Sequence, residues 1–211
     1  MMNMKTLFAA ALLSISGTAQ AHEIWIERDG DGPARIYLGE PEGALPPGGD
    51  PEFPKLKMPT LLGATSATPI RKAGYLEVVA PAGDVRAWDD NVFAPWGEEG
   101  AREGVIYYAR AGRSETRAAL PFEIVPVTAG GNRFRLVRDG RPVGDTAITV
   151  ITPDKWTRKI VTNADGTIEL TLREAGRYLL SAAVEEKGPH TLPGGDVQTL
   201  HRITTTTFVH S

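Results

Sequence analysis

Short apolar runs alternate with turn residues along the chain, and no apolar period of 3.6 residues persists over three helical turns. In the second half, successive runs have the length and the β-branched, alternating composition of strands. Asp139-Gly140 and Asp165-Gly166 place glycine where a turn needs a positive φ. The pattern predicts an all-β protein. The strands expected in this half are 121–127, 133–138, 147–151, 157–162, 167–172, 177–184 and 202–209.

The first half is less regular. A hairpin is expected from strands 22–27 and 34–38, which Asp-Gly-Asp-Gly joins. The proline-rich stretch 39–59 has too little apolar periodicity to belong to a core. In the second half, seven strands in about 90 residues match the strand count of an immunoglobulin-like sandwich. We therefore expect an irregular β domain over 22–118 and an Ig-like, prealbumin-like β-sandwich over 119–211.

The first residues have the pattern of a secretory signal peptide over 1–21. Lys5 supplies a positive charge, an apolar run follows, and the small residues Ala19 and Ala21 form an A-x-A cleavage site. The apolar run is shorter than the roughly 20 residues that a membrane-spanning helix needs. We expect cleavage after Ala21, export to a bacterial periplasm, and no membrane insertion of the processed chain.

Composition narrows the function. Lysine and arginine total 23 against 26 acidic residues, a net charge of −3 without a basic cluster, so nothing favours a nucleic-acid partner or an anionic membrane surface. The sequence contains no cysteine, which excludes disulfides, thiolate ligands and a cysteine nucleophile. Hydrolase, zinc-protease and phosphate-loop motifs are absent, so we expect no enzyme. Any metal site must use histidine, carboxylate, backbone or terminal-amine ligands.

Several segments occur in an order that is found in one family. They are HEIWIE after the signal peptide, IYLGEPEGAL, LPFEIVPV, and the long run FRLVRDGRPVGDTAITVITPDKWTRKIVTNADGTIELTLREAGRYLLSA. In these segments the chain resembles a periplasmic domain-of-unknown-function family whose members are labelled as nickel or cobalt uptake proteins. The resemblance spans nearly the whole of 22–211. It implies an irregular β N-terminal half, an Ig-like or transthyretin-like C-terminal half, and a membrane metal-uptake transporter as partner.

His22 would become the first residue of the processed chain. Its α-amine and Nδ1 can then close a six-membered chelate, and a second imidazole would complete a histidine brace. Such a nearly planar, all-nitrogen set suits Cu(II) or Ni(II). Because the amine must lose its proton, binding would strengthen as the pH rises through roughly 7.7 to 8.0. A leading histidine recurs in the resembling family, and Glu23 is a further ligand candidate beside it.

Three more histidines compete for the second ligand position. We rank His201, expected at a strand end, first; His190, in a Gly/Pro loop able to fold over a site, second; and His210, next to the C-terminus, third. An ordinary surface histidine is an open alternative for each of them, and His22 itself stands after a cleavage site by chance in some exported proteins. Sequence spacing does not choose between these residues, because the contacts would be non-local.

The main prediction is a periplasmic protein that binds nickel, cobalt or copper, or a metal chelate, and delivers it to an uptake transporter. Two alternatives stay open. A non-metal interaction module of a transporter system would depend on the loop 39–59 and not on the histidines. A copper-dependent polysaccharide oxidase would use the same histidine brace on a β-sandwich and release oxidised oligosaccharides.

Overall fold

The computed structural model describes residues 22–63 and 68–211, so the predicted signal peptide lies outside the described residues. These residues form an all-β structure, as predicted, with a short 3-10 turn at Phe53–Lys55. Among them, no helix is long and apolar enough to cross a membrane. The strands are β1 (Glu23–Arg28), β2 (Ala34–Gly39), β3 (Thr60–Leu62), β4 (Ile70–Arg71), β5 (Leu76–Val78), β6 (Val85–Asp89), β7 (Glu103–Ala111), β8 (Phe122–Pro126), β9 (Arg133–Arg138), β10 (Arg141–Pro142), β11 (Ala147–Ile151), β12 (Thr157–Val161), β13 (Thr167–Glu169), β14 (Gly176–Leu192) and β15 (Gly195–His210).

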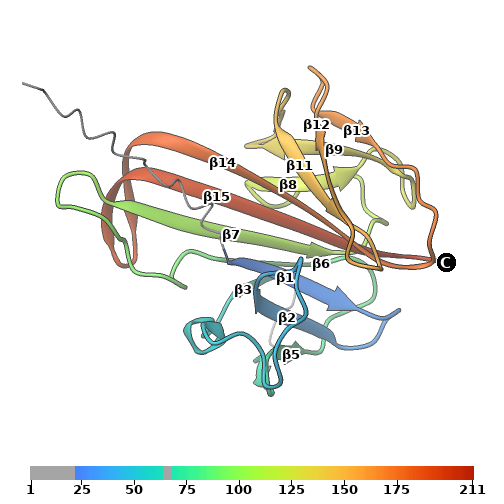
Figure 1. Cartoon of the computed structure of the whole chain (residues 1–211), viewed down its shortest axis with the longest axis horizontal. Coiled ribbons are helices and arrows are strands. Elements are labelled where there is room, and N and C mark those ends of the chain that lie inside the picture. Colours follow the sequence, from blue (N-terminus) through green and yellow to red (C-terminus); the bar gives the residue numbers. More distant parts are fainter. Residues whose placement is uncertain (1–21, 64–67) are drawn as a thin grey trace, which may run out of the picture.

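A long central sheet carries a smaller sheet on each face (Figure 1). The central sheet has the strand order β12-β11-β14-β15-β7-β6-β3, and β14 and β15 form its long hairpin. The sheet β1-β2-β5-β4 lies below the long strands in Figure 1, and the sheet of β8, β9, β10 and β13 lies above them. Since β15 pairs in parallel with β7, strands from both halves of the chain belong to one sheet. The division expected at 118/119 therefore runs through the central sheet.

Four consecutive threonines of β15, Thr204–Thr207, are fully buried in the middle of the molecule. Successive side chains of a strand point to opposite faces, so these threonines serve both outer sheets. Thr205 Oγ1 donates to the carbonyl of Ile24 in β1 at 2.7 Å, and Thr206 Oγ1 donates to the carbonyl of Ile124 in β8 at 2.8 Å. Both outer sheets are thus tied to the same central strand.

A hydrophobic core lies on each side of the central sheet. The core under β8 and β9 contains Phe122 and Phe134, and the core over β1 and β2 contains Phe53 and Leu56. The last two residues come from 39–59, which we expected to lie outside the core. That prediction is wrong for both residues, because the 3-10 turn directs their side chains inward without any local periodicity that the sequence could display.

A buried ion-pair network joins the two halves of the chain. Glu123 is fully buried, and its Oε1 accepts hydrogen bonds from Arg86 Nε at 2.7 Å and Arg110 Nη1 at 2.9 Å. Its Oε2 accepts from the backbone N–H groups of Ala119 and Leu120 at 2.7 and 2.9 Å. Glu123 therefore fastens the linking segment to β6 and β7. Both of its oxygens have partners, as a buried charge requires.

Candidate functional site

His22 immediately precedes β1, and its side chain is 27% exposed. Behind it, Ile24 and Ile26 pack into the core between β1 and the central sheet, while Trp25 belongs to a separate cluster on the other face of β1. The side chains of β1 thus alternate between its two faces. Because the strand is anchored on both faces, His22 is held at a fixed place on the rim of the molecule.

The imidazole of His22 is paired with a carboxylate. His22 Nε2 lies 3.2 Å from Asp50 Oδ1, and the same oxygen accepts the backbone N–H of Glu52 at 2.7 Å. A carboxylate oxygen accepts hydrogen bonds, so the neutral tautomer of His22 that fits this contact carries its proton on Nε2 and leaves the lone pair of Nδ1 free. Histidines that bind metals through one ring nitrogen commonly donate the other N–H to a carboxylate in this way.

A close backbone approach brings Asp50 to His22. Gly49 and Gly74 have φ angles of 91° and 86°, and a Cβ on Gly49 would stand only 2.2 Å from Gly74 Cα. Side chains are excluded at this crossing, which explains the glycine at each position. The stretch that follows β2 can therefore fold back onto the sheet and carry Asp50 to a partner 28 residues away in the sequence.

An aromatic wall completes the surroundings of His22. The ring of Phe93 is tilted by 60° to the imidazole, with 6.0 Å between the ring centroids. Phe93 in turn contacts Tyr107 at 6.3 Å, and Lys55 Nζ lies 4.8 Å from the Phe93 centroid. The imidazole thus stands between a carboxylate and an apolar surface, which limits the positions that its ring can adopt.

Glu23 lies on the opposite face of β1 from Ile24, and its side chain reaches β14. Ser181 Oγ in β14 donates to Glu23 Oε1 at 2.6 Å, while Oε2 is buried and has no hydrogen-bond partner among the described residues. Burial raises the pKa of Glu23 to about 7, against the lowering effect of the Ser181 hydrogen bond, and the charge of Glu42 raises it further. Burial raises the pKa of Tyr107 as well, and the charge of Glu23 adds to this rise. Glu23 is thus a buried carboxylate that titrates near neutrality, a property typical of functional sites.

His201 lies inside β15 and not at a strand end, because β15 begins at Gly195. His201 Nε2 lies 2.6 Å from Glu103 Oε2, and its ring stacks on Trp96 with 5.8 Å between centroids and 18° between planes. His201 therefore repeats the carboxylate and aromatic surroundings of His22 with a different pair of neighbours.

His190 belongs to β14 and not to a loop that folds over a site, so that prediction is wrong. The apparent loop signal Gly188-Pro189 is absorbed by an irregularity in register between Lys187 and His190, and the hairpin turns only at Pro193-Gly194. His190 Nε2 is buried without a hydrogen-bond partner among the described residues.

The predicted ligands are dispersed. His22 and Glu23 point in opposite directions from one strand, His201 has its own carboxylate partner, and His210 ends β15 against the ring of Tyr178. No group of three or more histidine, aspartate and glutamate side chains with a metal-binding arrangement occurs in 22–63 and 68–211. A chelate at His22 would therefore depend on the α-amine together with the side chain.

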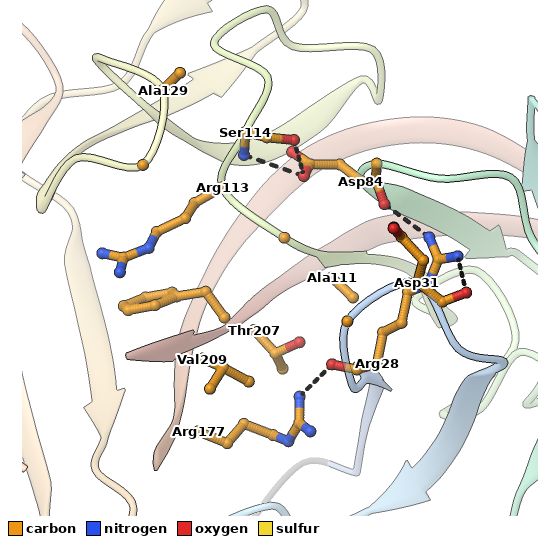
Figure 2. Close-up of a pocket in the computed structure, with 15 residues that line it drawn as sticks. Arg28, Asp31, Asp84, Ala111, Arg113, Ser114, Ala129, Arg177, Thr207 and Val209 are labelled. Carbon is orange, nitrogen blue, oxygen red and sulfur yellow. Dashed lines mark hydrogen bonds between the residues drawn. The ribbon is translucent and has the colours of Figure 1, made fainter. Parts of the chain in front are cut away.

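A second candidate is a pocket of about 400 Å³ near the far end of β1 (Figure 2). Its lining includes Arg28, Arg113 and Arg177. The Arg28 guanidinium donates to five backbone carbonyls at 2.7–3.1 Å, and Arg177 pairs with Asp29. Arg113 Cζ lies 4.5 Å from the ring centroid of Phe208. These cations hold strand ends and turns together, so His22 is the stronger candidate for a functional site.

Sequence reasoning missed Asp50 and Phe93. The one local signal for Asp50 is its position between two glycines and a proline, Gly48-Gly49-Asp50-Pro51, which indicates a turn and no partner. Comparison of the chain with protein-family models, with curated proteins and with solved structures finds no match, so the function must be argued from this geometry.

Proposed function

We propose that the exported chain is cleaved before His22 and that its new N-terminus binds nickel, cobalt or copper in the periplasm, for delivery to an uptake transporter. The hydrogen bond between His22 Nε2 and Asp50 carries the proposal. It selects the tautomer in which Nδ1 has a lone pair, and Nδ1 is the ring nitrogen that closes a six-membered chelate with the α-amine.

A terminal chelate of this kind suits a metal ion that the protein delivers to another protein. Two nitrogens of His22 would occupy neighbouring positions, and the remaining positions would stay open to water, to a chelator or to a ligand of the transporter. His201 is the ranked candidate for a further ligand, and Glu23 stands behind the chelate as a buried negative charge above its pKa of about 7. We therefore propose a binding protein and not an enzyme.

The test starts from protein recovered after export, whose intact mass shows whether the chain begins at His22. Calorimetric titration with Ni(II), Co(II) and Cu(II) should give micromolar binding, which corresponds to roughly −8 kcal/mol. His22→Ala should abolish this binding. His210→Ala is the matched control, because it removes a histidine at the far end of β15 and should leave the affinity unchanged.

Two results would redirect the proposal. Binding that is unaffected by His22→Ala, or none tighter than about 100 µM, would remove the chelate and favour the interaction module. Release of oxidised oligosaccharides by copper-loaded protein with a reductant would instead identify the polysaccharide oxidase.

A further inference from the structure

The strand β12 is an unprotected edge of the central sheet. It is the last strand in the sheet order and pairs with β11 alone. Thr152 N–H donates to the carbonyl of Trp156 at 2.9 Å, which marks the hydrogen-bonded positions of this hairpin. In an antiparallel pair the alternate residues direct both backbone groups away from the partner strand. The residues of β12 that direct their N–H and C=O groups outward are therefore Thr157, Lys159 and Val161.

A pocket of about 430 Å³ lies beside this edge, between β12 and β13. The side chains of Val150, Ile160, Leu170 and Leu172 are the apolar part of its lining. It borders β13, which is only three residues long and contributes Glu169 to the lining. Closed sandwiches fill this space with side chains of their own outer strands.

Trp156 lies in the turn immediately before β12 and is 73% exposed. The turn that carries it is rigid, because Thr152 Oγ1 accepts the Trp156 N–H at 3.1 Å and Lys155 Nζ reaches the Pro41 carbonyl at 3.0 Å. Lys155 also adopts a φ of 68°, a conformation that tertiary contacts must hold in place. An exposed tryptophan on a fixed turn, followed by an arginine at Arg158, has the residue types that dominate protein–protein contacts.

The charge of the edge distinguishes between possible occupants. Arg158 and Lys159 are exposed, and neither side chain has an ion pair or hydrogen bond within the described ranges. A second copy that paired through its own β12 would set these like charges against each other, which is unfavourable between neighbouring strands. The pocket lining also carries acidic side chains: Asp154 lies in the turn before β12, and Glu169 and Glu174 lie in and after β13. On β12 itself the exposed charges, Arg158 and Lys159, are both basic.

We infer that β12 and the adjoining pocket form a docking edge for an extended, acidic segment of a partner protein. The segment pairs with the outward backbone groups of β12 as an added strand, places carboxylates near Arg158 and Lys159, and inserts an apolar side chain beside Trp156. Main-chain hydrogen bonds supply much of the affinity in this mode of recognition, and the side-chain pocket supplies specificity. The inference is independent of metal binding at His22.

The sharpest test separates the backbone of Lys159 from its charge. Lys159→Pro removes an outward N–H that β11 does not use, and proline is tolerated on an edge strand at such a position. Lys159→Gln removes the same charge and keeps the N–H. A displayed library of short random peptides is selected on the full chain and on both variants, after far-UV circular dichroism has shown that each variant is folded.

Acidic, strand-forming peptides should be enriched on the native chain and retained on Lys159→Gln to within a fewfold. Their binding should fall by at least about tenfold on Lys159→Pro, which loses the main-chain pairing. Trp156→Ala changes an exposed side chain and leaves the backbone of the edge strand intact. It should weaken the binding of the same peptides by about tenfold or more. Val79→Ala, at another exposed apolar residue, is the control and should change nothing.

Equal binding to the proline and glutamine variants, or enrichment of basic peptides, would overturn the inference. Self-association that Lys159→Pro abolishes would assign the edge to a second copy instead. Failure to enrich peptides, together with retention on a neutral oligosaccharide that Trp156→Ala abolishes, would assign the pocket to a saccharide.

Discussion

Two glutamates whose carboxylates are buried have opposite surroundings. Glu123, where the halves of the chain meet, accepts hydrogen bonds from two arginines and two backbone N–H groups. Glu23, next to His22, accepts one hydrogen bond from Ser181, and its Oε2 has no partner in the described part of the chain. The first arrangement is complete and stabilises the fold. The second leaves a buried carboxyl oxygen without a partner, and burial raises the pKa of the group to about 7.

The difference between Glu123 and Glu23 indicates which region of the molecule is not optimised for stability. Buried polar groups in native proteins are almost always hydrogen-bonded, and an exception calls for a reason other than packing. The incomplete carboxylate lies one residue from the proposed N-terminal chelate, on the opposite side of the strand. The Glu123 network therefore serves the structure, and the start of β1 is the end of the molecule where we propose the function.

The largest expected effect comes from Glu123→Leu. The substitution leaves Arg86 and Arg110 buried without their shared carboxylate, and breaking a buried ion pair from one side costs about 3–5 kcal/mol. Equilibrium unfolding in urea measures the loss. A loss below about 1 kcal/mol would show that Asp84 and Glu115, the other acids of the network, satisfy both arginines without Glu123.

The pH dependence of Glu23 should be the next largest effect. Because folding raises its pKa from 4.5 to about 7, the folded state holds a proton that the unfolded state releases. The stabilisation is complete below pH 4.5 and is lost as the pH rises through 7, by about 3 kcal/mol in total. Glu23→Gln should abolish this decline. Parallel pH profiles of the unfolding free energy for the two proteins would contradict the assigned burial.

Removal of Asp50 should act on metal binding more than on folding. Asp50→Ala leaves the His22 ring without its orienting partner and should weaken the affinity by about 10- to 100-fold, or ~1.4–2.7 kcal/mol. Asp50→Asn keeps an acceptor oxygen and should lie between the native chain and Asp50→Ala. Competition titration against a metallochromic chelator ranks the three proteins. Equal affinities would show that Asp50 does not orient the ligand.

The smallest effect belongs to a solvent-exposed pair. Lys72 Nζ lies 3.4 Å from Glu77 Oε1, with the lysine side chain 42% exposed. Exposed pairs contribute about 0.2–1 kcal/mol, so Lys72→Ala should change the urea midpoint only slightly. This variant is the reference for an exposed ion pair. If it lost as much unfolding free energy as Glu123→Leu, burial would not explain the difference between the two ion pairs.

Local patterns predict the strands of this molecule well. The expected strands 133–138 and 147–151 coincide with β9 and β11, because turn residues bound both of them closely. The long hairpin was underestimated. Glycine and proline near His190 are typical of a loop, but in the folded chain a register irregularity accommodates them and pairing continues to Leu192.

The residues that surround His22 could not be predicted from the sequence, because they are distant from it along the chain. His22 and Glu23 stand out because of their position in the chain, which is local information. Asp50 reaches His22 only because two backbones cross at Gly49 and Gly74, and no pattern within either segment records that crossing. The all-β fold can thus be predicted from the periodicity of the sequence, while the partner of His22 depends on tertiary packing.

The most direct test of the central claim compares two chains that differ only at the α-amine of His22. Both begin at His22; one keeps the free amine, and in the other an acetyl group converts the amine into an amide and keeps every side chain. We expect micromolar copper or nickel binding, about −8 kcal/mol, for the chain with the free amine and at least a hundredfold weaker binding for the acetylated chain. Equal affinity of the two chains would contradict the terminal chelate.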